Sequence, residues 1–260
     1  MKQAINTGVI GGTGLSEMAG LTIVREHAVS TPFGACSGAI SEGILGDGQR
    51  LFFLHRHGPS DRPIPPHRVN YRANLWALRE LGVNRIIAAN AVGAINAQLK
   101  PGRLVIPDQL IDYTWGREHS FDDGERGHLL HVDFTEPFDS QLRRQLLAAS
   151  LSAAVPCEDG AVVAVVQGPR LETAAEVRRL ARDGCDLVGM TTMPEAALAR
   201  ELAIPYAAVA MVVNAAAGLD DRPISLSEIH EALKRETQLF AALVAAFLVA
   251  AAAPQADQVQ

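Results

Sequence analysis

The sequence predicts an α/β protein, a single domain with a central mixed, largely parallel β-sheet flanked by helices. Short apolar runs suited to strands alternate with helical patterns, and this alternation is typical of parallel sheets. Hydrophobic residues make up 48% of the 260 residues and charged residues 20%, as in folded globular proteins. No run of Pro, Gly or Ser divides the chain, so we expect one domain over residues 1–260, ending in a loose tail at 254–260.

The expected strands are short apolar runs, several of which lead into polar or glycine-rich motifs. In chain order they are Thr7–Ile10, Arg50–Leu54, Arg85–Asn90, Leu104–Asp108, Ala161–Gln167, Leu187–Met190 and Tyr206–Asn214. The expected helices carry apolar residues at helical spacing. They are Asn70–Leu81, Asp139–Ser152, Thr173–Asp183, Pro194–Leu202 and Ser227–Ala253. One long irregular segment, Tyr113–Pro137, separates two of these elements, and segments of that length in compact domains are usually functional or mobile.

Composition excludes several classes of function. A net charge of −6 argues against a nucleic-acid partner, which would require a basic face. The three cysteines have no metal-ligand spacing, so we expect a reducing, cytoplasmic location and no metal. The start of the chain lacks the pattern of a signal peptide. The longest apolar stretch, Leu239–Ala253, falls short of the about 20 residues that a membrane span needs, so no membrane partner is expected.

Two motifs follow early strands and are each ambiguous alone. Gly11–Gly14 is either a tight turn or a cradle of backbone N–H groups for an anion. It matches neither the dinucleotide fingerprint, since Glu17 stands where a third Gly is required, nor the P-loop. Arg56-His57-Gly58 is either a donor cluster for phosphate or carboxylate, or a solvated surface cluster. The same triplet occurs in histidine phosphatases, which would make His57 the phosphorylated residue.

Later motifs lie at the carboxyl ends of expected strands, where ligands bind in parallel sheets. They are Ala88–Ala94, Gly168–Thr173, Gly189–Glu195 and Val212–Gly218. Each also has a structural explanation. Glu172 is suited to a helix N-terminus, and Thr191 and Thr192 are suited to capping. Asn214 is either a turn former or a hydrogen-bonding partner for the edge of a purine.

In this order and spacing, these segments and Asn70–Asn74 resemble the trimeric branch of the purine nucleoside phosphorylase family, which includes methylthioadenosine phosphorylases. The resemblance covers nearly the whole chain. It implies a homotrimer acting on a small-molecule purine nucleoside, with inorganic phosphate as co-substrate and neither cofactor nor metal. It assigns phosphate binding to Thr13, Arg56, His57, the backbone of Asn90 and Ala91, and Thr191. It places Met190 against the ribose, and makes His57 and Asn214 the catalytic residues.

The side chains at these matching positions indicate which base is selected. The adenine-selective branch carries aspartates where this chain has Asn214 and Ala216. Asn214 is able to donate to a 6-oxo group and accept from N7–H, while Glu172 is able to accept from N1–H. This pair predicts a hypoxanthine or guanine base. Leu171 replaces a stacking Phe of relatives, and Ala215 leaves no aromatic ring beside Asn214.

The 5′ end of the sugar is expected to meet an apolar residue. Relatives that act on ordinary nucleosides place a His near the start of the last helix, and the matching position here is Leu226. Met211 and the Tyr113–Pro137 segment are further candidates to line this pocket. An apolar wall suits a methylthio group and leaves a hydroxyl unpaired, at a cost of about 1–3 kcal/mol.

Together these features predict phosphorolysis of 5′-methylthioinosine to hypoxanthine and 5-methylthioribose 1-phosphate. The alternatives within the family are a general inosine and guanosine phosphorylase and a methylthioadenosine phosphorylase. A non-catalytic nucleoside-binding protein and a histidine phosphatase are alternatives from other classes.

Overall fold

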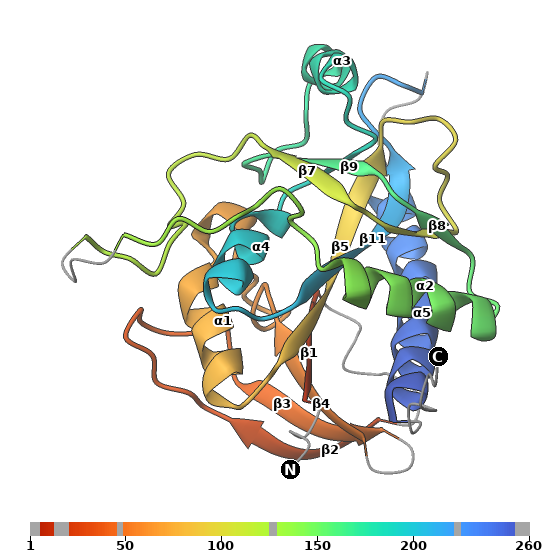
Figure 1. Ribbon diagram of the computed structural model, residues 1–260. Coiled ribbons are helices and arrows are strands. Elements are labelled where there is room, and N and C mark those ends of the chain that lie inside the picture. The colour runs from red at the N-terminus through yellow and green to blue at the C-terminus, as the bar shows by residue number, and fades with distance from the viewer. Residues whose placement is uncertain (1–5, 13–20, 46–48, 125–128, 221–224, 253–260) are drawn as a thin grey trace, which may run out of the picture.

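The computed structural model describes residues 6–12, 21–45, 49–124, 129–220 and 225–252, and their strands form one eleven-stranded mixed sheet (Figure 1). The strands are β1 (Thr7–Gly11), β2 (Leu21–His27), β3 (Ile40–Leu45), β4 (Gln49–His55), β5 (Arg85–Ala94), β6 (Leu104–Ile106), β7 (Gln109–Asp112), β8 (Cys157–Asp159), β9 (Val162–Val165), β10 (Leu187–Gly189) and β11 (Tyr206–Ala215). The helices are α1 (Tyr71–Glu80), α2 (Ser140–Ser152), α3 (Ala174–Arg182), α4 (Thr192–Glu201) and α5 (Leu226–Ala252), with a 3₁₀ turn at Pro66–Arg68. The predicted α/β class is confirmed.

Strand β5 is the centre of the sheet. It pairs in parallel with β1 and β11, and its last residues pair antiparallel with β10. Because β10 runs back along the end of β5, its carboxyl end comes close to the middle of β5. The carboxyl ends of β1 and β4 approach the same region from the other side. Strands from both halves of the chain therefore end around one point on β5.

The sheet has helices on both faces, α1 and α4 on one and α2 and α5 on the other (Figure 1). Alternate residues of the central strands follow this division, as the two-residue repeat of a strand requires. Ile10 and Ala88 belong to the core under α1 and α4, while their neighbours Val9 and Ile87 belong to the core under α2 and α5. Strands buried on both faces appear in the sequence as continuous apolar runs.

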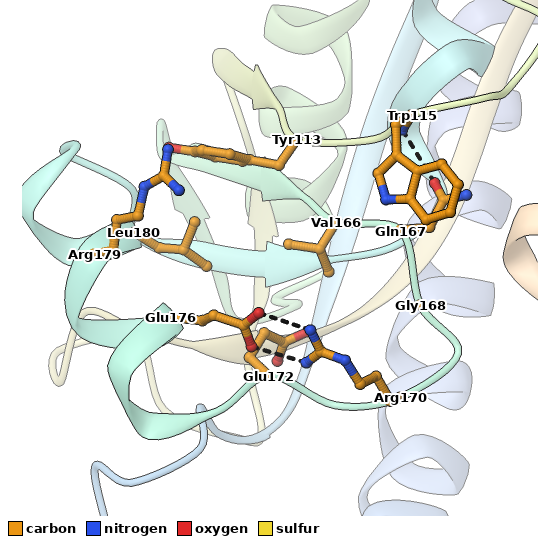
Figure 2. Close-up of a pocket in the computed structure, with 10 residues that line it drawn as sticks. All are labelled: Tyr113, Trp115, Val166, Gln167, Gly168, Arg170, Glu172, Glu176, Arg179 and Leu180. Atoms are coloured by element: carbon orange, nitrogen blue, oxygen red, sulfur yellow. Dashed lines mark hydrogen bonds and ion pairs between the residues drawn. The ribbon is translucent and has the colours of Figure 1, made fainter.

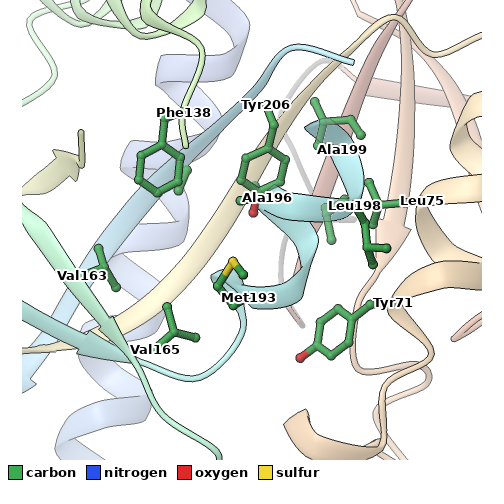
Figure 3. Packing of buried hydrophobic residues seen from close by; sticks show 14 of the residues in the cluster. Tyr71, Leu75, Phe138, Val163, Val165, Met193, Ala196, Leu198, Ala199 and Tyr206 are labelled. Carbon is green, nitrogen blue, oxygen red and sulfur yellow. The ribbon is translucent and has the colours of Figure 1, made fainter. Parts of the chain in front are cut away.

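Helix α4, near the site, is buried along most of its length. Its Met193, Ala196 and Leu198 lie among residues of α1, β9 and β11, with Tyr71 and Tyr206 on either side (Figure 3). This packing fixes both the helix and the residues that precede it. The first turn of α4 can therefore hold a side chain in a defined position at the centre of the molecule.

Each of the seven expected strands and five expected helices is present, with ends displaced by a few residues. The sequence analysis missed β2, β3, β7 and β8. Strand β2 is exposed along most of its length, and its apolar residues are confined to Leu21–Val24. The three residues of β8 include two carboxylates. Strands β2 and β3 form an antiparallel extension with β4, which makes the sheet more mixed than the central strands suggest. The expected tail at 254–260 lies outside the described residues.

Candidate active site

A cavity of about 320 Å³ opens where these strands meet on β5. Ten of the expected site residues line it: Arg56, His57, Ala91, Leu171, Glu172, Met190, Thr191, Met211, Asn214 and Ala216. They come from the ends of β4, β10 and β11, from the middle of β5, and from the turn before α3. Residues more than a hundred positions apart in the chain thus line one cavity.

The remaining expected residues lie elsewhere. Asn90 is buried directly behind the cavity wall. Ala215 lines a neighbouring cavity on the far side of Asn214. Leu226, at the start of α5, is 67% exposed and is outside the cavity lining. Thr13 falls outside the described residues, although Gly12 just before it does line the cavity.

Arg56 lies at one end of the cavity and is 2% exposed. Its Nε and Nη2 donate to the two carboxylate oxygens of Glu195 at 2.5 and 3.0 Å, and its Nη1 donates to the Ala89 carbonyl at 2.8 Å. Burial alone would lower the pKa of this guanidinium, but the Glu195 carboxylate raises it above the ordinary value. Arg56 is therefore a permanently protonated donor group, and the solvated surface cluster considered for this motif is excluded.

His57 adds a second polar group at this end. Its Nδ1 lies 2.8 Å from the Ile64 carbonyl, an acceptor that requires the proton on Nδ1. Burial, and then the positive charge of Arg56, lower the pKa of the imidazole. The ring is therefore neutral at pH 7, and its Nε2 is an acceptor.

Thr191 contributes a hydroxyl group to the same end. It occupies the N-cap position of α4, yet its side chain makes no capping hydrogen bond. Instead its Oγ1 accepts from Asn90 Nδ2 at 2.7 Å. With that lone pair occupied, the hydroxyl hydrogen is free to turn into the cavity. The prediction that the Thr191 side chain caps this helix is therefore wrong.

Glu172 and Asn214 are two further polar residues of the cavity lining. Burial raises the pKa of Glu172. Asn214 follows a register shift in β11 after Val212, where one extra residue interrupts the pairing with β5. Such a bulge re-aims the side chain that follows it. Asn214 Nδ2 donates to the Ala215 carbonyl at 2.6 Å, which leaves its second N–H and its Oδ1 without a partner in the described residues.

The loop that carries Glu172 is held from outside the cavity. Arg170 forms two hydrogen bonds with Glu176, at 2.8 and 2.7 Å, on the wall of an adjoining cavity (Figure 2). Thr173 and Glu176 form a reciprocal cap at the start of α3. Arg170 first, and then the Thr173 backbone, lower the pKa of Glu176 to about 2. Gly168 has a φ of +63°, and a Cβ there would lie 2.5 Å from Met190 Sδ, so this position requires glycine.

Comparison with known proteins identifies the family. The model of the phosphorylase superfamily matches residues 6–249. The chain belongs to this superfamily. It is 49% identical, over 87% of its length and 91% of the relative's, to a probable S-methyl-5′-thioinosine phosphorylase of Pseudomonas syringae. It is 44% identical to a 6-oxopurine nucleoside phosphorylase of Pyrococcus furiosus, over 92% of this chain and 90% of that one.

Solved structures of nucleoside phosphorylases have the same fold. A methylthioadenosine phosphorylase from an antarctic soil metagenomic library superposes with a TM-score of 0.88 at 34% identity, over 98% of this chain and 89% of that chain. A Schistosoma mansoni methylthioadenosine phosphorylase in complex with adenine superposes with a TM-score of 0.88 at 30% identity, over 96% and 93%. The chain is therefore a nucleoside phosphorylase, an enzyme of the pentosyltransferase class.

The sequence analysis missed several residues of this phosphorylase site. Ile229 and Leu233, one turn apart on α5, form an apolar wall with Met211 and Val213. Their spacing of four places them on one helix face, and this periodicity was the available signal. Leu226 lies on the turn before Ile229, so the expected helix supplies the wall, but from a later turn.

Arg117, in the long irregular segment of the phosphorylase, was also missed. It is 9% exposed and donates to four backbone carbonyls, those of Val166, Gln167, Met190 and Met193. These carbonyls belong to the ends of β9 and β10 and to the start of α4. Arg117 therefore ties together three segments that form the cavity, and no sequence pattern marks it.

Within the described ranges of the phosphorylase, no three His, Cys, Asp or Glu side chains gather as a metal would require. In the same ranges, no helix is both long and apolar enough to cross a membrane.

Proposed function

We propose that this phosphorylase catalyses the reversible phosphorolysis of S-methyl-5′-thioinosine to hypoxanthine and 5-methylthioribose 1-phosphate. One observation carries the proposal: Glu172, Asn214 and an apolar wall of Ile229 and Leu233 line the same cavity as Arg56. Relatives named probable S-methyl-5′-thioinosine phosphorylase, at 45–50% identity, support it.

The polar pair favours a 6-oxopurine. The free N–H of Asn214 donates to O6, and its Oδ1 accepts from N7–H. The Glu172 carboxylate accepts from N1–H, a proton that hypoxanthine has and adenine lacks. A site built to make a given hydrogen bond discriminates by orders of magnitude against a base that lacks the partner. Ala216, where adenine-selective relatives carry a second aspartate, adds no acceptor for a 6-amino group.

The apolar wall favours a methylthio group at the 5′ position. Ile229, Leu233 and Met211 offer no hydrogen bond to a 5′-hydroxyl, and burying one unpaired costs about 1–3 kcal/mol. A methylthio group has no donor to satisfy and gains from apolar contact.

The reaction proceeds through positioning and electrostatics. Arg56, the Thr191 hydroxyl and the backbone at Ala91, with Thr13 as the family resemblance implies, hold phosphate beneath C1′, and Met190 lies against the ribose. The C1′–N9 bond breaks with its electron pair passing to the purine. N7 of the purine takes up a proton, which overall is the one that hydrogen phosphate loses, and Asn214 Oδ1 accepts a hydrogen bond from that N7–H. A phosphate oxygen then bonds to the positively charged C1′. Neutral His57 holds the phosphate through Nε2, which accepts a proton that the anion carries.

Three further proposals accompany this function. Inorganic phosphate is the co-substrate, and no cofactor is required. The protein forms a homotrimer, which exposed apolar side chains on the long segment, Trp115, Leu129 and Leu130, support. The enzyme works in the cytoplasm, a reducing compartment that suits its three free cysteines.

The deciding experiment is a phosphate-dependent assay with methylthioinosine, methylthioadenosine and inosine, in which the released base is identified. We expect kcat/KM for methylthioinosine to exceed both others by at least about tenfold. Equal activity on inosine would favour the second candidate, a general 6-oxopurine nucleoside phosphorylase, which the Pyrococcus furiosus relative supports. Release of adenine at a comparable rate would contradict the assigned base contacts.

A further inference from the structure

Glu195 is a fully buried carboxylate that the sequence analysis did not assign to the site. It lies in the first turn of α4 with 0% exposure. Its oxygens accept hydrogen bonds from Arg56 Nε at 2.5 Å, Arg56 Nη2 at 3.0 Å and the Tyr206 hydroxyl at 2.9 Å. The ion pair joins residues 139 positions apart and is buried.

This contact fixes the plane of the Arg56 guanidinium. Arginine carries five N–H donors in a rigid fork. Glu195 takes two of them and the Ala89 carbonyl takes a third, which leaves one on Nη1 and one on Nη2. The described residues supply no further acceptor for these two, and Arg56 lines the cavity. A tetrahedral oxyanion can accept both.

We propose that Glu195 is a positioning residue for phosphate: it holds Arg56 so that the two remaining N–H groups point at the anion. The inference rests on the proposed function, because it concerns the phosphate that the reaction consumes. Glu195 itself does not line the cavity, so its effect must pass through Arg56.

The charge of Glu195 has a second consequence. The buried pair is neutral as a whole, and His57 is neutral as well. Phosphate is then held mainly by directed hydrogen bonds, so its own negative charge is not cancelled by the protein. That charge remains available to stabilise the positive charge that develops at C1′.

A purely structural ion pair is the competing explanation. Replacement of a buried ion pair by apolar residues of similar volume is often neutral for stability, so folding alone does not require this pair. A structural role predicts that substitutions lower stability without a selective effect on phosphate. A positioning role predicts a rise in the KM for phosphate while the KM for the nucleoside is unchanged.

The test begins with Glu195→Gln, which removes the charge and one acceptor. We expect the KM for phosphate to rise at least about tenfold, and the KM for the nucleoside at saturating phosphate to stay within about twofold. The matched control is Glu42→Gln, which removes another buried carboxylate paired with an arginine, Arg50, and with His27, but outside the cavity lining. Unchanged phosphate KM in Glu195→Gln would overturn the proposal, as would an equal rise in the control.

A double-mutant cycle tests whether Glu195 acts through Arg56. In an Arg56→Met background, Glu195→Gln is expected to cause no further rise in the phosphate KM. Additive effects would overturn the proposal. If Glu195→Gln fails to fold, Tyr206→Phe, which removes one donor to the carboxylate, is expected to raise the phosphate KM at least about twofold, and no change would refute the assignment.

Failure of this inference is distinguishable from failure of the proposed function. Wild-type enzyme that releases no hypoxanthine from methylthioinosine contradicts the function, whatever the variants do. Titration calorimetry of phosphate alone provides a readout without turnover. Wild-type binding that weakens at least about tenfold in Glu195→Gln supports the positioning role, and equal binding overturns it.

Discussion

The base contacts of Asn214 are tested most directly by Asn214→Asp, which changes an amide to a carboxylate of almost the same shape. Asn214 lines the cavity and donates one N–H to the Ala215 carbonyl at 2.6 Å, while its second N–H has no partner in the described residues. An aspartate at this position has no N–H. It therefore loses the donor to O6 and faces the Ala215 carbonyl with a second acceptor.

The magnitude follows from these two losses. An acceptor left unpaired in a buried site costs about 1–3 kcal/mol. Since about 1.4 kcal/mol corresponds to a factor of ten, kcat/KM for methylthioinosine should fall about five- to 150-fold. The carboxylate accepts from a 6-amino group, and hydrogen bonds to an ionised group are stronger than neutral ones. We therefore expect kcat/KM for methylthioadenosine to rise, and the preference to shift by at least the same factor.

The assay compares phosphate-dependent release of hypoxanthine and adenine from the two methylthio nucleosides. Asn70→Asp is the matched control, because Asn70 also donates Nδ2 to a backbone carbonyl, that of Phe33 at 2.7 Å, but lies outside the cavity lining. It should leave the ratio of kcat/KM values unchanged. A ratio that moves less than about twofold in Asn214→Asp would refute the assigned contact.

Three further predictions concern other parts of the site. Ile229→His adds a hydrogen-bond donor to the apolar wall, so kcat/KM for inosine relative to methylthioinosine should rise about tenfold in a competition assay. Leu226→His, at the exposed start of α5, is the control and should leave this ratio unchanged. If only Leu226→His raised the ratio, the 5′ wall would have to be assigned to Leu226. Asn90→Ala removes the donor that orients the Thr191 hydroxyl, so the KM for phosphate should rise about three- to tenfold. Thermal unfolding should show that the variant is still folded, and an unchanged KM for phosphate would refute the contact. Glu172 must be ionised to accept from N1–H, and burial raises its pKa. As the pH is lowered, kcat/KM for the nucleoside should therefore begin to fall at a higher pH than the pKa of an ordinary glutamate, about 4.3, would give. If the same acid-side fall in kcat/KM remains in Glu172→Gln, it belongs to another group.

The central strands could be predicted from the sequence because they are buried on both faces. Strand β11 is buried along nearly its whole length and appears as one long apolar run. Strand β2 is exposed along most of its length, and its conformation depends on pairing with β3 rather than on its own side chains. Its Thr22, Ile23 and Val24 are residues that favour strands, but they are followed by the polar Arg25–His27, so the local signal is short.

The site could be predicted in part for a related reason. Motifs that follow strands are local in sequence, and the sheet brings their ends together, as Arg56 and Asn214 illustrate. Glu195 was within a motif, but nothing local distinguishes a carboxylate that pairs with an arginine from one that faces solvent. Arg117 was hidden for the same reason, because its four carbonyl partners lie 49 to 76 residues further along the chain.

The base-binding and phosphate-binding parts of the cavity differ in how their charged side chains are neutralised, and the difference matches the ligand that each part binds. The base end keeps an ionisable carboxylate, Glu172, whose pKa is raised by burial despite the opposing positive charge of Arg170. It therefore gains most from a substrate that brings an N–H. At the phosphate end, Arg56 is paired with Glu195 and the pair is neutral as a whole. The protein therefore offers the incoming phosphate hydrogen-bond donors but little net positive charge. A nucleoside and a phosphate bound side by side then leave an excess of negative charge between them, at the position where the ribosyl carbon becomes positive.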